Sequence, residues 1–315
     1  MPCMFLVTGG AGFIGSHVAE RLLRDGHRVR VLDNFSSGSR ENLAFAMGNS
    51  RLEVVEGDLR DARATADATR GVEVIFHQAA MRSVPRSVDD PLGANENNVT
   101  GTLNLLTAAR EAGVRRVVYA SSSSIYGDRP DLPKREDQPP APISPYAVSK
   151  LAGELYCAAW SRLYGLEAVG LRYFNVFGAR QDPASQYAAV IPRFITWALA
   201  GAPLEVHGDG TQSRDFTHID NVVEANLLAA SAPGVAGETF NVGCGSRVSL
   251  LEIIGFLEGI VGRKLERRHT ALRQGDVPHT QADIGKAKRF LGYAPLVEFE
   301  EGLRRTVEYF RRGRS

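Results

Sequence analysis

Tyr146 and Lys150 stand four residues apart in the stretch SPYAVSK, and such a pair could move a proton. If this stretch is helical, the two side chains share one helical face. A free tyrosine has a pKa of about 10. A neighbouring cation favours the phenolate, which would let Tyr146 act as a base near neutral pH. Many surface helices contain this spacing by chance, so it predicts catalysis only together with the motifs that accompany it.

A run of four serines, residues 121–124, follows the apolar stretch RVVY upstream of Tyr146. Ligands of open parallel sheets bind at the carboxyl ends of the strands. A serine hydroxyl at such an end could hold a substrate oxygen opposite the tyrosine. An ordinary turn is the alternative interpretation of the run.

The segment LVTGGAGFIGSH carries Gly9, Gly12 and Gly15 between a predicted strand and a predicted helix. Glycines at this spacing permit a tight turn and let the backbone approach a pyrophosphate at the helix N-terminus. In this context the motif predicts a dinucleotide-binding loop. The alternative is a plain turn between strand and helix.

Asp33 closes the second predicted strand, in VLDNFSSG. A carboxylate at this place accepts hydrogen bonds from a ribose and repels a 2′-phosphate, which favours NAD over NADP. Arg40 lies close in sequence and weakens that exclusion of NADP. Asp58 and Leu59 end the third strand, where an adenine is expected. His77 ends the fourth strand and is expected to be a packed histidine rather than a base.

Short β-branched runs alternate with helical patterns in the first half of the chain. Strands are expected at 3–9, 27–33, 51–58, 72–80, 115–123 and 166–176, and helices at 12–25, 40–47, 61–70, 96–112 and 146–164. This alternation predicts an α/β fold with a Rossmann-type, doubly wound parallel sheet. Residues 1–175 form the expected NAD-binding domain, to which the chain returns around 215–245. Residues 176–315 mainly form a smaller C-terminal α/β substrate lobe, with a strand at 237–243 and helices near 250–261, 284–291 and from 300.

The overall composition excludes several classes of protein. The chain has 315 residues, 37 basic and 36 acidic side chains and 43% apolar residues, so it lacks the net positive charge of a typical nucleic-acid binder. Its three cysteines, Cys3, Cys157 and Cys244, lack metal-ligand spacing, and no metal is expected. No apolar run is long enough to span a membrane, and no signal peptide is evident, so a cytoplasmic location is expected.

Six motifs, VTGGAGFIGSH, SSSSIYG, SPYAVSK, LRYFNVFG, GDGTQSRDF and GDVPHTQAD, follow one another over nearly the whole chain. Together they resemble the extended short-chain dehydrogenase/reductase family, the NAD-dependent nucleotide-sugar epimerases and dehydratases. The chain is most similar to the branch of UDP-N-acetylglucosamine and UDP-glucose 4-epimerases. The resemblance implies NAD as the cofactor, a UDP-sugar as the substrate and a homodimer.

The resemblance also implies roles for single residues. In 4-epimerisation through a transient 4-keto sugar, Tyr146 takes and returns the proton of the 4-hydroxyl group. Lys150 positions the nicotinamide ribose and lowers the pKa of Tyr146. Ser122 binds the 4-oxygen, and Ser123 assists. The implied cofactor-binding residues are Gly9, Gly12, Phe13, Ile14, Gly15, Asp33, Asn34, Ser36, Ser37, Gly38, Asp58, Leu59, Gln78, Ala79, Ala80, Arg82, Asn97, Ser121, Tyr146, Lys150 and Tyr173.

The substrate pocket follows from the same motifs. The implied residues are Ser83, Ser122, Tyr146, Asn175, Ala189, Val190, Arg214, Arg273, Asp276 and Thr280. Arg214 and Arg273 would grip the diphosphate, and Asp276 would bind the uridine ribose. Thr280 stands where glucose-restricted members carry a tyrosine. Its small side chain favours UDP-N-acetylglucosamine and UDP-N-acetylgalactosamine, with UDP-glucose and UDP-galactose tolerated.

Three other functions remain open at this point. The family's dehydratases carry an aspartate and a glutamate where this chain has Ser123 and Ser124, which argues against water elimination. A UDP-glucuronate 4-epimerase and an NADP-linked reductase of a 4-keto sugar would use the same fold. A non-enzymatic NAD-binding regulator is the third alternative, although such a protein would be expected to lose Tyr146 or Lys150.

Overall fold

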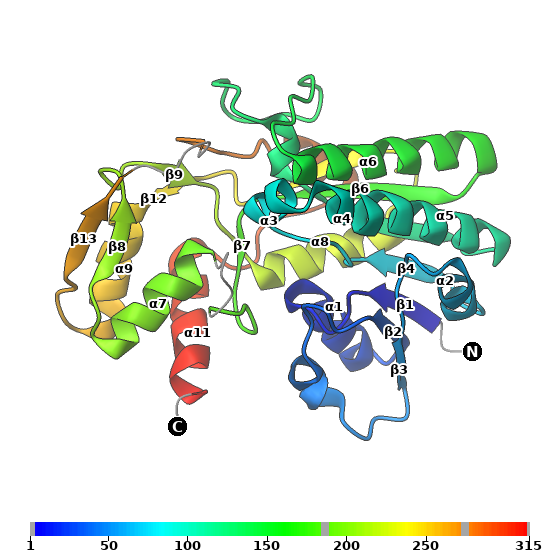
Figure 1. The fold of residues 1–315 in the computed structure, drawn as a ribbon, viewed down its shortest axis with the longest axis horizontal. Coiled ribbons are helices and arrows are strands. Elements are labelled where there is room, and N and C mark those ends of the chain that lie inside the picture. The colour runs from blue at the N-terminus through cyan, green and yellow to red at the C-terminus, as the bar shows by residue number, and fades with distance from the viewer. Residues whose placement is uncertain (1–3, 184–188, 272–276, 314–315) are drawn as a thin grey trace.

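A seven-stranded parallel sheet forms the larger part of the molecule in the computed structural model, which describes residues 4–183, 189–271 and 277–313 (Figure 1). The strand order is β11-β6-β5-β4-β1-β2-β3. Every neighbouring pair in this sheet is parallel. The strands are β1 (Met4–Thr8), β2 (Arg28–Asp33), β3 (Leu52–Glu56), β4 (Val74–His77), β5 (Arg116–Ser122), β6 (Glu167–Tyr173) and β11 (Thr239–Val242).

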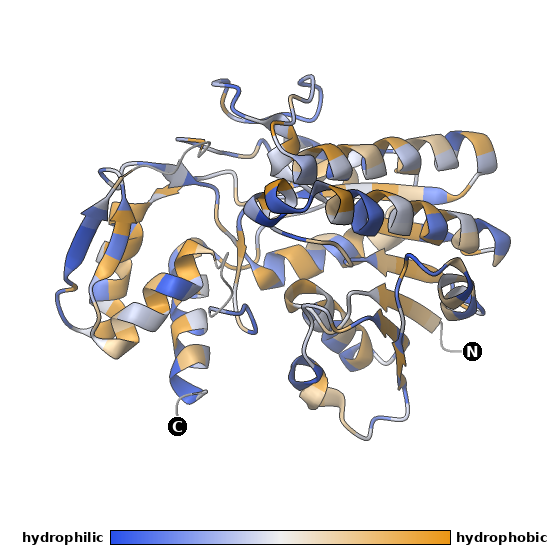
Figure 2. Ribbon diagram, in the orientation of Figure 1, coloured by the Kyte–Doolittle hydropathy of each residue, from blue (hydrophilic) through white to orange (hydrophobic). Residues whose placement is uncertain are grey.

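Helices cover both faces of this sheet. On one face α1 (Phe13–Arg24) and α8 (Ile219–Ser231) pack together, and their apolar side chains share one core with the strands. On the other face a second core joins the strands to α2 (Ala62–Thr69), α5 (Gly101–Glu111) and α6 (Pro145–Tyr164). Figure 2 shows the strands of the sheet as mainly hydrophobic, as expected for strands buried on both faces.

Local signals fix the start and end of α6, the helix that carries Tyr146 and Lys150. The Ser144 hydroxyl caps the helix by accepting from the Ala147 N–H at 3.2 Å, and Pro145 occupies the first helical position. Gly165 ends the helix in the left-handed conformation at φ 71°. Tyr146 therefore lies in the first turn, at the end of the helix that faces the carboxyl ends of the strands.

A smaller lobe lies beside the sheet (Figure 1). It contains α7 (Val190–Ala200), α9 (Leu250–Val261), α11 (Phe299–Arg312) and the parallel pair β8 (Leu204–His207) and β13 (Arg267–Thr270). These elements enclose a separate apolar core, which includes Phe194, Ile253 and Leu303. The remaining short elements are η1 (Arg40–Ala46), α3 (Val84–Asp89), α4 (Pro91–Asn95), η2 (Glu96–Thr100), η3 (Ser123–Tyr126), β7 (Val176–Phe177), β9 (Ser213–Arg214), β10 (Thr217–His218), β12 (Val248–Ser249) and α10 (Gly285–Leu291).

The predicted fold class is confirmed, because the sheet is parallel and flanked by helices on both faces. Helix α8 was not predicted from the sequence, and where one helix was expected over 96–112 a π-helical turn, η2, precedes α5. The chain rejoins the sheet through α8 and β11, while the division at residue 175 stays a prediction. Across the described ranges no helix is long and apolar enough to cross a membrane, and no group of three or more His, Cys, Asp or Glu could hold a metal ion.

Candidate active site

Two adjoining cavities lie at the carboxyl ends of the strands and between the sheet and the lobe. The first has a volume of about 560 Å³ and the second about 470 Å³. Ala189 lines both cavities. Every residue assigned above to cofactor binding lines the first cavity. These residues are spread over positions 9 to 173 of the sequence, and the fold brings them together at one site.

The glycine loop brings backbone close to backbone at the first cavity. Gly9 has φ +65°, and a Cβ atom there would lie 2.7 Å from the backbone of Ala79. A Cβ atom on Gly15 would lie 2.2 Å from the carbonyl oxygen of Gly9. Gly12 caps α1 without a side-chain hydrogen bond. The N-terminus of α1 therefore faces the cavity as a group of N–H donors, which suits an anion.

The Asp33 carboxylate is fixed at the rim of the same cavity. Its two oxygens accept hydrogen bonds from the Ala11 N–H at 2.9 Å and the Phe35 N–H at 2.8 Å. Burial raises the pKa of Asp33 above its ordinary value, and the two N–H donors oppose that rise. Arg40 is engaged elsewhere, because it pairs with Glu56 at 2.6 Å and stacks on the Phe35 ring. A cation held in this way does little to offset the negative charge of Asp33.

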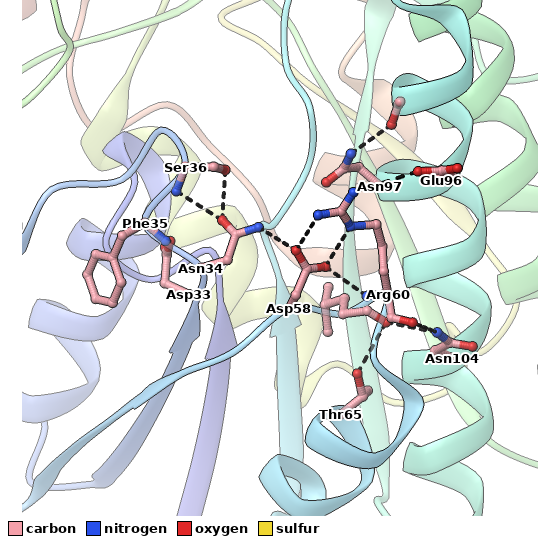
Figure 3. A network of polar contacts seen from close by, with 12 residues as sticks. Asp33, Asn34, Phe35, Ser36, Asp58, Arg60, Thr65, Glu96, Asn97 and Asn104 are labelled. Atoms are coloured by element: carbon pink, nitrogen blue, oxygen red, sulfur yellow. Dashed lines mark hydrogen bonds and ion pairs between the residues drawn. The ribbon is translucent and has the colours of Figure 1, made fainter.

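A polar network closes the end of this cavity near Asp58 (Figure 3). Arg60 donates to both carboxylate oxygens of Asp58, at 3.0 and 2.8 Å, and Asn34 donates to the same group at 2.8 Å. The Arg60 hydrogen bonds hold the pKa of Asp58 well below its usual range. Glu96 lies 3.7 Å from Arg60 on the other side. The Asp58 carboxylate is therefore ionised and held in one orientation.

Lys150 is buried beneath the first cavity. Its ammonium group donates to the carbonyl oxygen of Ala120, the residue before the serine run, at 2.8 Å. The same nitrogen lies 5.9 Å from the centre of the Tyr146 ring and 5.2 Å from that of Tyr119. Burial lowers the pKa of Lys150 to about 8, against the opposing charge of Glu154. The predicted pair of tyrosine and lysine thus lies together at the end of β5.

The pKa of Tyr146 differs from the expectation. Burial raises it above the ordinary value, while the Ser122 hydroxyl and the positive charge of Arg82 lower it. Lys150 was expected to be the cause of a lowered value, but its ammonium group is directed to the Ala120 carbonyl instead. The protein groups around Tyr146 therefore leave the phenol harder to ionise than a free tyrosine.

Three of the four serines line one or other of the two cavities. Ser121 lines the first cavity and donates to the buried carboxylate of Glu154. Ser122, which is 8% exposed, ends β5 and accepts from the Ser124 N–H at 3.2 Å. Ser123 and Ser124 line the second cavity. Ser122, whose hydroxyl lowers the Tyr146 pKa, lies in sequence between serines of the two cavities but lines neither of them.

The second cavity gathers five of the ten predicted substrate residues: Asn175, Ala189, Val190, Arg214 and Thr280. The Asn175 amide donates to the Thr280 hydroxyl at 3.3 Å and to the Asp215 carbonyl at 3.0 Å. Arg214 donates to the Pro278 carbonyl at 2.8 Å. Ser83 instead lines the first cavity. Arg273 and Asp276 lie outside the described residues.

Known proteins resemble this chain over its whole length. Residues 5–243 match the description "NAD dependent epimerase/dehydratase family". The chain belongs to this family. It is 44% identical to a UDP-glucose 4-epimerase of Mycolicibacterium smegmatis, over 97% of this chain and 98% of that protein. The structure of a UDP-N-acetylglucosamine 4-epimerase from Methanobrevibacter ruminantium matches with a TM-score of 0.94 and 38% identity, over 99% of this chain and 100% of that one.

A UDP-glucuronic acid 4-epimerase from Bacillus cereus is also similar, with a TM-score of 0.91 and 33% identity over 98% of this chain and 99% of that one. The expectations of an enzyme and of NAD as its cofactor are thereby confirmed, since the family depends on NAD. The relatives differ in their sugars, so family membership alone leaves the sugar undecided.

The first cavity of this epimerase/dehydratase family member fits NAD. The close backbone contacts at Gly9 and Gly15 leave room only for glycine and expose the N-terminus of α1, where a pyrophosphate binds. Asp33 stands where the adenosine ribose is expected, and Asp58 where the adenine is expected. Lys150 lies under the other end of the cavity, beside Tyr146.

Several lining residues were not among the predicted ones. Arg86 on α3, Met81, Gln181 and Asp182 also line the first cavity, and Phe216, Gln212 and Arg193 line the second. Gln181 and Asp182 follow FGAR, a few residues after the strand expected at 166–176. The polar cluster RQD in this loop was the signal that could have identified them.

Proposed function

We propose that this enzyme interconverts the carbon-4 epimers of a UDP-hexose, with UDP-N-acetylglucosamine and UDP-N-acetylgalactosamine as the preferred pair. One observation carries the proposal. Tyr146 and Lys150 line a cavity that fits NAD, and an adjoining cavity holds Asn175 and Thr280. The Ser122 hydroxyl lies close enough to Tyr146 to lower its pKa. Relatives named as 4-epimerases of UDP-glucose, UDP-N-acetylglucosamine and UDP-glucuronate support the reaction at carbon 4.

In the proposed reaction Tyr146 handles the proton. Its phenolate oxygen takes the proton of the 4-hydroxyl group as carbon 4 becomes a ketone, and it returns the proton when carbon 4 is reduced from the opposite side. The glycine loop, Asp33 and Lys150 would hold NAD, which would supply the hydride acceptor and donor for carbon 4. Ser122 donates to the 4-oxygen and keeps it next to Tyr146. One residue serves both directions, so the reaction needs no second acid.

The raised pKa of Tyr146 bears on this proposal. Arg82 and Ser122 lower the pKa less than burial raises it. Forming the phenolate near pH 7 therefore requires more positive charge beside the ring than these two groups supply. The oxidised cofactor carries such a charge. Tyr146 would then remove the sugar proton only when NAD is bound. Enzyme without NAD would keep the phenol protonated.

The sugar preference rests on the small side chains of the second cavity. Thr280 presents a hydroxyl that already accepts from Asn175, rather than an aromatic ring. Ala189 and Val190 on the opposite segment are also small. We expect this space to take the N-acetyl group on carbon 2. Arg214 lines the same cavity and would bind the diphosphate through its guanidinium group.

The homodimer is also proposed from an exposed apolar stripe on α6. Val148, Leu155 and Leu163 are 53%, 63% and 68% exposed, and their spacing puts them on one helical face. Leu92 on the adjacent α4 is 77% exposed. A second copy is the occupant that the family resemblance implies for this face. Light scattering of the purified protein tests it, and a monomeric mass would contradict it. The cytoplasmic location stays a prediction.

Proton NMR of purified protein mixed with UDP-N-acetylglucosamine, without added cofactor, tests the proposed function. We expect the UDP-N-acetylgalactosamine anomeric signal to appear, because each cycle regenerates NAD. Conversion of UDP-galactose alone would retain the reaction and refute the sugar preference. Conversion of UDP-glucuronate alone would show that the enzyme is a UDP-glucuronate 4-epimerase and would refute the proposed sugar. No conversion of any of these sugars, even with NAD added, would refute 4-epimerisation.

A further inference from the structure

A short chain segment joins the sheet to the lobe along the first cavity. It runs from Gly178 to Pro183, between β7 and α7. Gln181 and Asp182 in this segment line the first cavity together with the glycine loop and the start of α1. One part of the cavity wall is thus formed by α1 and another part by the 178–183 segment.

Arg180 attaches this segment to α1. Its guanidinium group forms an ion pair with the Glu20 carboxylate and lies 3.4 Å from the Ser16 hydroxyl. The side chains of Arg180 and Glu20 are each 15% exposed. The guanidinium group also lies over the Phe45 ring, 4.8 Å from its centre. Ser16 and Glu20 lie in the first two turns of α1, directly after the glycine loop.

The backbone of the 178–183 segment is held in a defined conformation. Arg180 has φ +64°, in the left-handed region that residues with a Cβ atom seldom adopt, so its side chain is held at a conformational cost. Gly178 packs against α8, where a Cβ atom would lie 2.5 Å from Ile219. Gln181 is 9% exposed and donates to the Val176 carbonyl at 3.2 Å. The segment is therefore held at Gly178, Arg180 and Gln181.

The charges around Arg180 favour the pair. His17, the neighbouring residue on α1, has a pKa lowered to about 4 by burial and by the charge of Arg180, so it is neutral at pH 7 and does not repel the arginine. Arg24 is the second partner of Glu20, but it approaches from solvent and is 71% exposed. Of the two cations on Glu20, only Arg180 links α1 to another segment.

We propose that the Arg180–Glu20 ion pair is a clasp that slows the release of NAD. Arg180 acts as a positioning residue, because it holds the 178–183 segment against α1 and does not itself line the cavity. Movement of such a wall segment often limits ligand release, and a contact that holds the segment against α1 would slow that movement. The inference rests on the NAD dependence of the family and is independent of which sugar is the substrate.

The test compares Arg180→Met, Glu20→Gln and, as the matched control, Arg24→Met. Arg180→Met keeps an apolar stem over Phe45 and removes the charge. The bound NAD of each purified protein is measured after denaturation, and its release rate is followed after dilution, with no sugar present. We expect about tenfold faster release from Arg180→Met and from Glu20→Gln, which corresponds to the loss of about 1.4 kcal/mol from the barrier. Arg24→Met should release NAD as the wild type does.

Two further measurements separate a clasp from general support of the fold. The melting temperature of the NAD-free protein should be almost unchanged in Arg180→Met. The double variant Glu20→Gln/Arg180→Met should release NAD no faster than Arg180→Met, because both changes break one interaction. Unchanged release from Arg180→Met, fully additive effects in the double variant, or an NAD-free form that is destabilised as much as the loaded form would each overturn the proposal.

Discussion

Glu154 and Arg172 form an ion pair in the interior, close to the proposed catalytic residues. Arg172 Nε and Nη2 donate to the two carboxylate oxygens of Glu154 at 2.9 and 2.8 Å, and the side chains are 8% and 5% exposed for Arg172 and Glu154. The Ser121 hydroxyl donates to the same carboxylate, and Arg172 also donates to the Tyr126 hydroxyl at 2.8 Å. The pair thus connects α6 and β6 to the strand end that lines the first cavity.

Glu154→Ala should strongly destabilise the protein. It leaves the buried Arg172 charge without its carboxylate, which costs about 3–5 kcal/mol in comparable sites. Urea unfolding measures the loss. The double change Glu154→Met with Arg172→Met should recover much of it, because no buried charge then remains. As a control, Glu300→Ala removes the exposed pair with Arg304 and should cost less than about 1 kcal/mol. A mild effect of Glu154→Ala would show that water or another group replaces the carboxylate.

Tyr146→Phe should remove turnover while the protein keeps its fold and its NAD. The variant loses only the phenolic oxygen, and loss of a general base typically costs about 10²–10⁴-fold in rate. Turnover of UDP-sugar and the NAD content of the purified variant are measured together. Ser123→Ala is a useful comparison, since Ser123 lines the second cavity and is expected only to assist. Wild-type turnover in Tyr146→Phe would exclude this tyrosine as the base.

Activity should fall as the pH rises through about 8. Burial lowers the pKa of Lys150 to about 8, so the ammonium group that should position the nicotinamide ribose becomes neutral above that pH. The pH profile of kcat/KM measures the alkaline limb. Lys150→Arg keeps its charge at high pH and should move the limb upward, even if its maximum rate is lower. If the alkaline limb of kcat/KM lies at the same pH in Lys150→Arg as in the wild type, a group other than Lys150 causes it.

The same lowered pKa predicts how Lys150 affects stability. The unfolded chain binds this proton up to about pH 10.5 and the folded chain only up to about pH 8. The buried charge therefore destabilises the fold below pH 8, and this penalty fades between those two values. Lys150→Met should raise the melting temperature at pH 7 although it abolishes turnover. An equal or lower melting temperature at pH 7 would indicate that the Ala120 hydrogen bond outweighs the desolvation.

Thr280→Tyr should change the sugar preference without removing the reaction. A tyrosine ring at this position would occupy the space beside Asn175 that is proposed for the N-acetyl group. We expect kcat/KM for UDP-N-acetylglucosamine to fall by about 10–200-fold, the range that a steric change in a pocket produces, with UDP-glucose much less affected. Thr280→Ser controls for the loss of the methyl group. Parallel losses for both sugars would show that Thr280 does not select the sugar.

The sequence predicted those features whose signals are local. The glycine loop, Asp33 at a strand end and the pair Tyr146 and Lys150 are each contained in about a dozen residues. The alternation of strands and helices was enough to predict the parallel sheet, which the structure confirms. Helix α8 was not predicted, although it begins at Ile219, only three residues after the motif GDGTQSRDF ends at Phe216.

The tertiary structure alone decided which distant residues meet. Asn175 contacts Thr280 across 105 positions, and Arg180 reaches Glu20 across 160. No periodicity or spacing encodes such contacts, because they depend on the order of the strands in the sheet and on how the lobe packs beside it. The pKa values of Tyr146 and Lys150 also depend on burial, which only the folded chain creates. The sequence by itself thus determined the chemical groups and the fold class, whereas long-range packing determined their charges, their partners and the space between them.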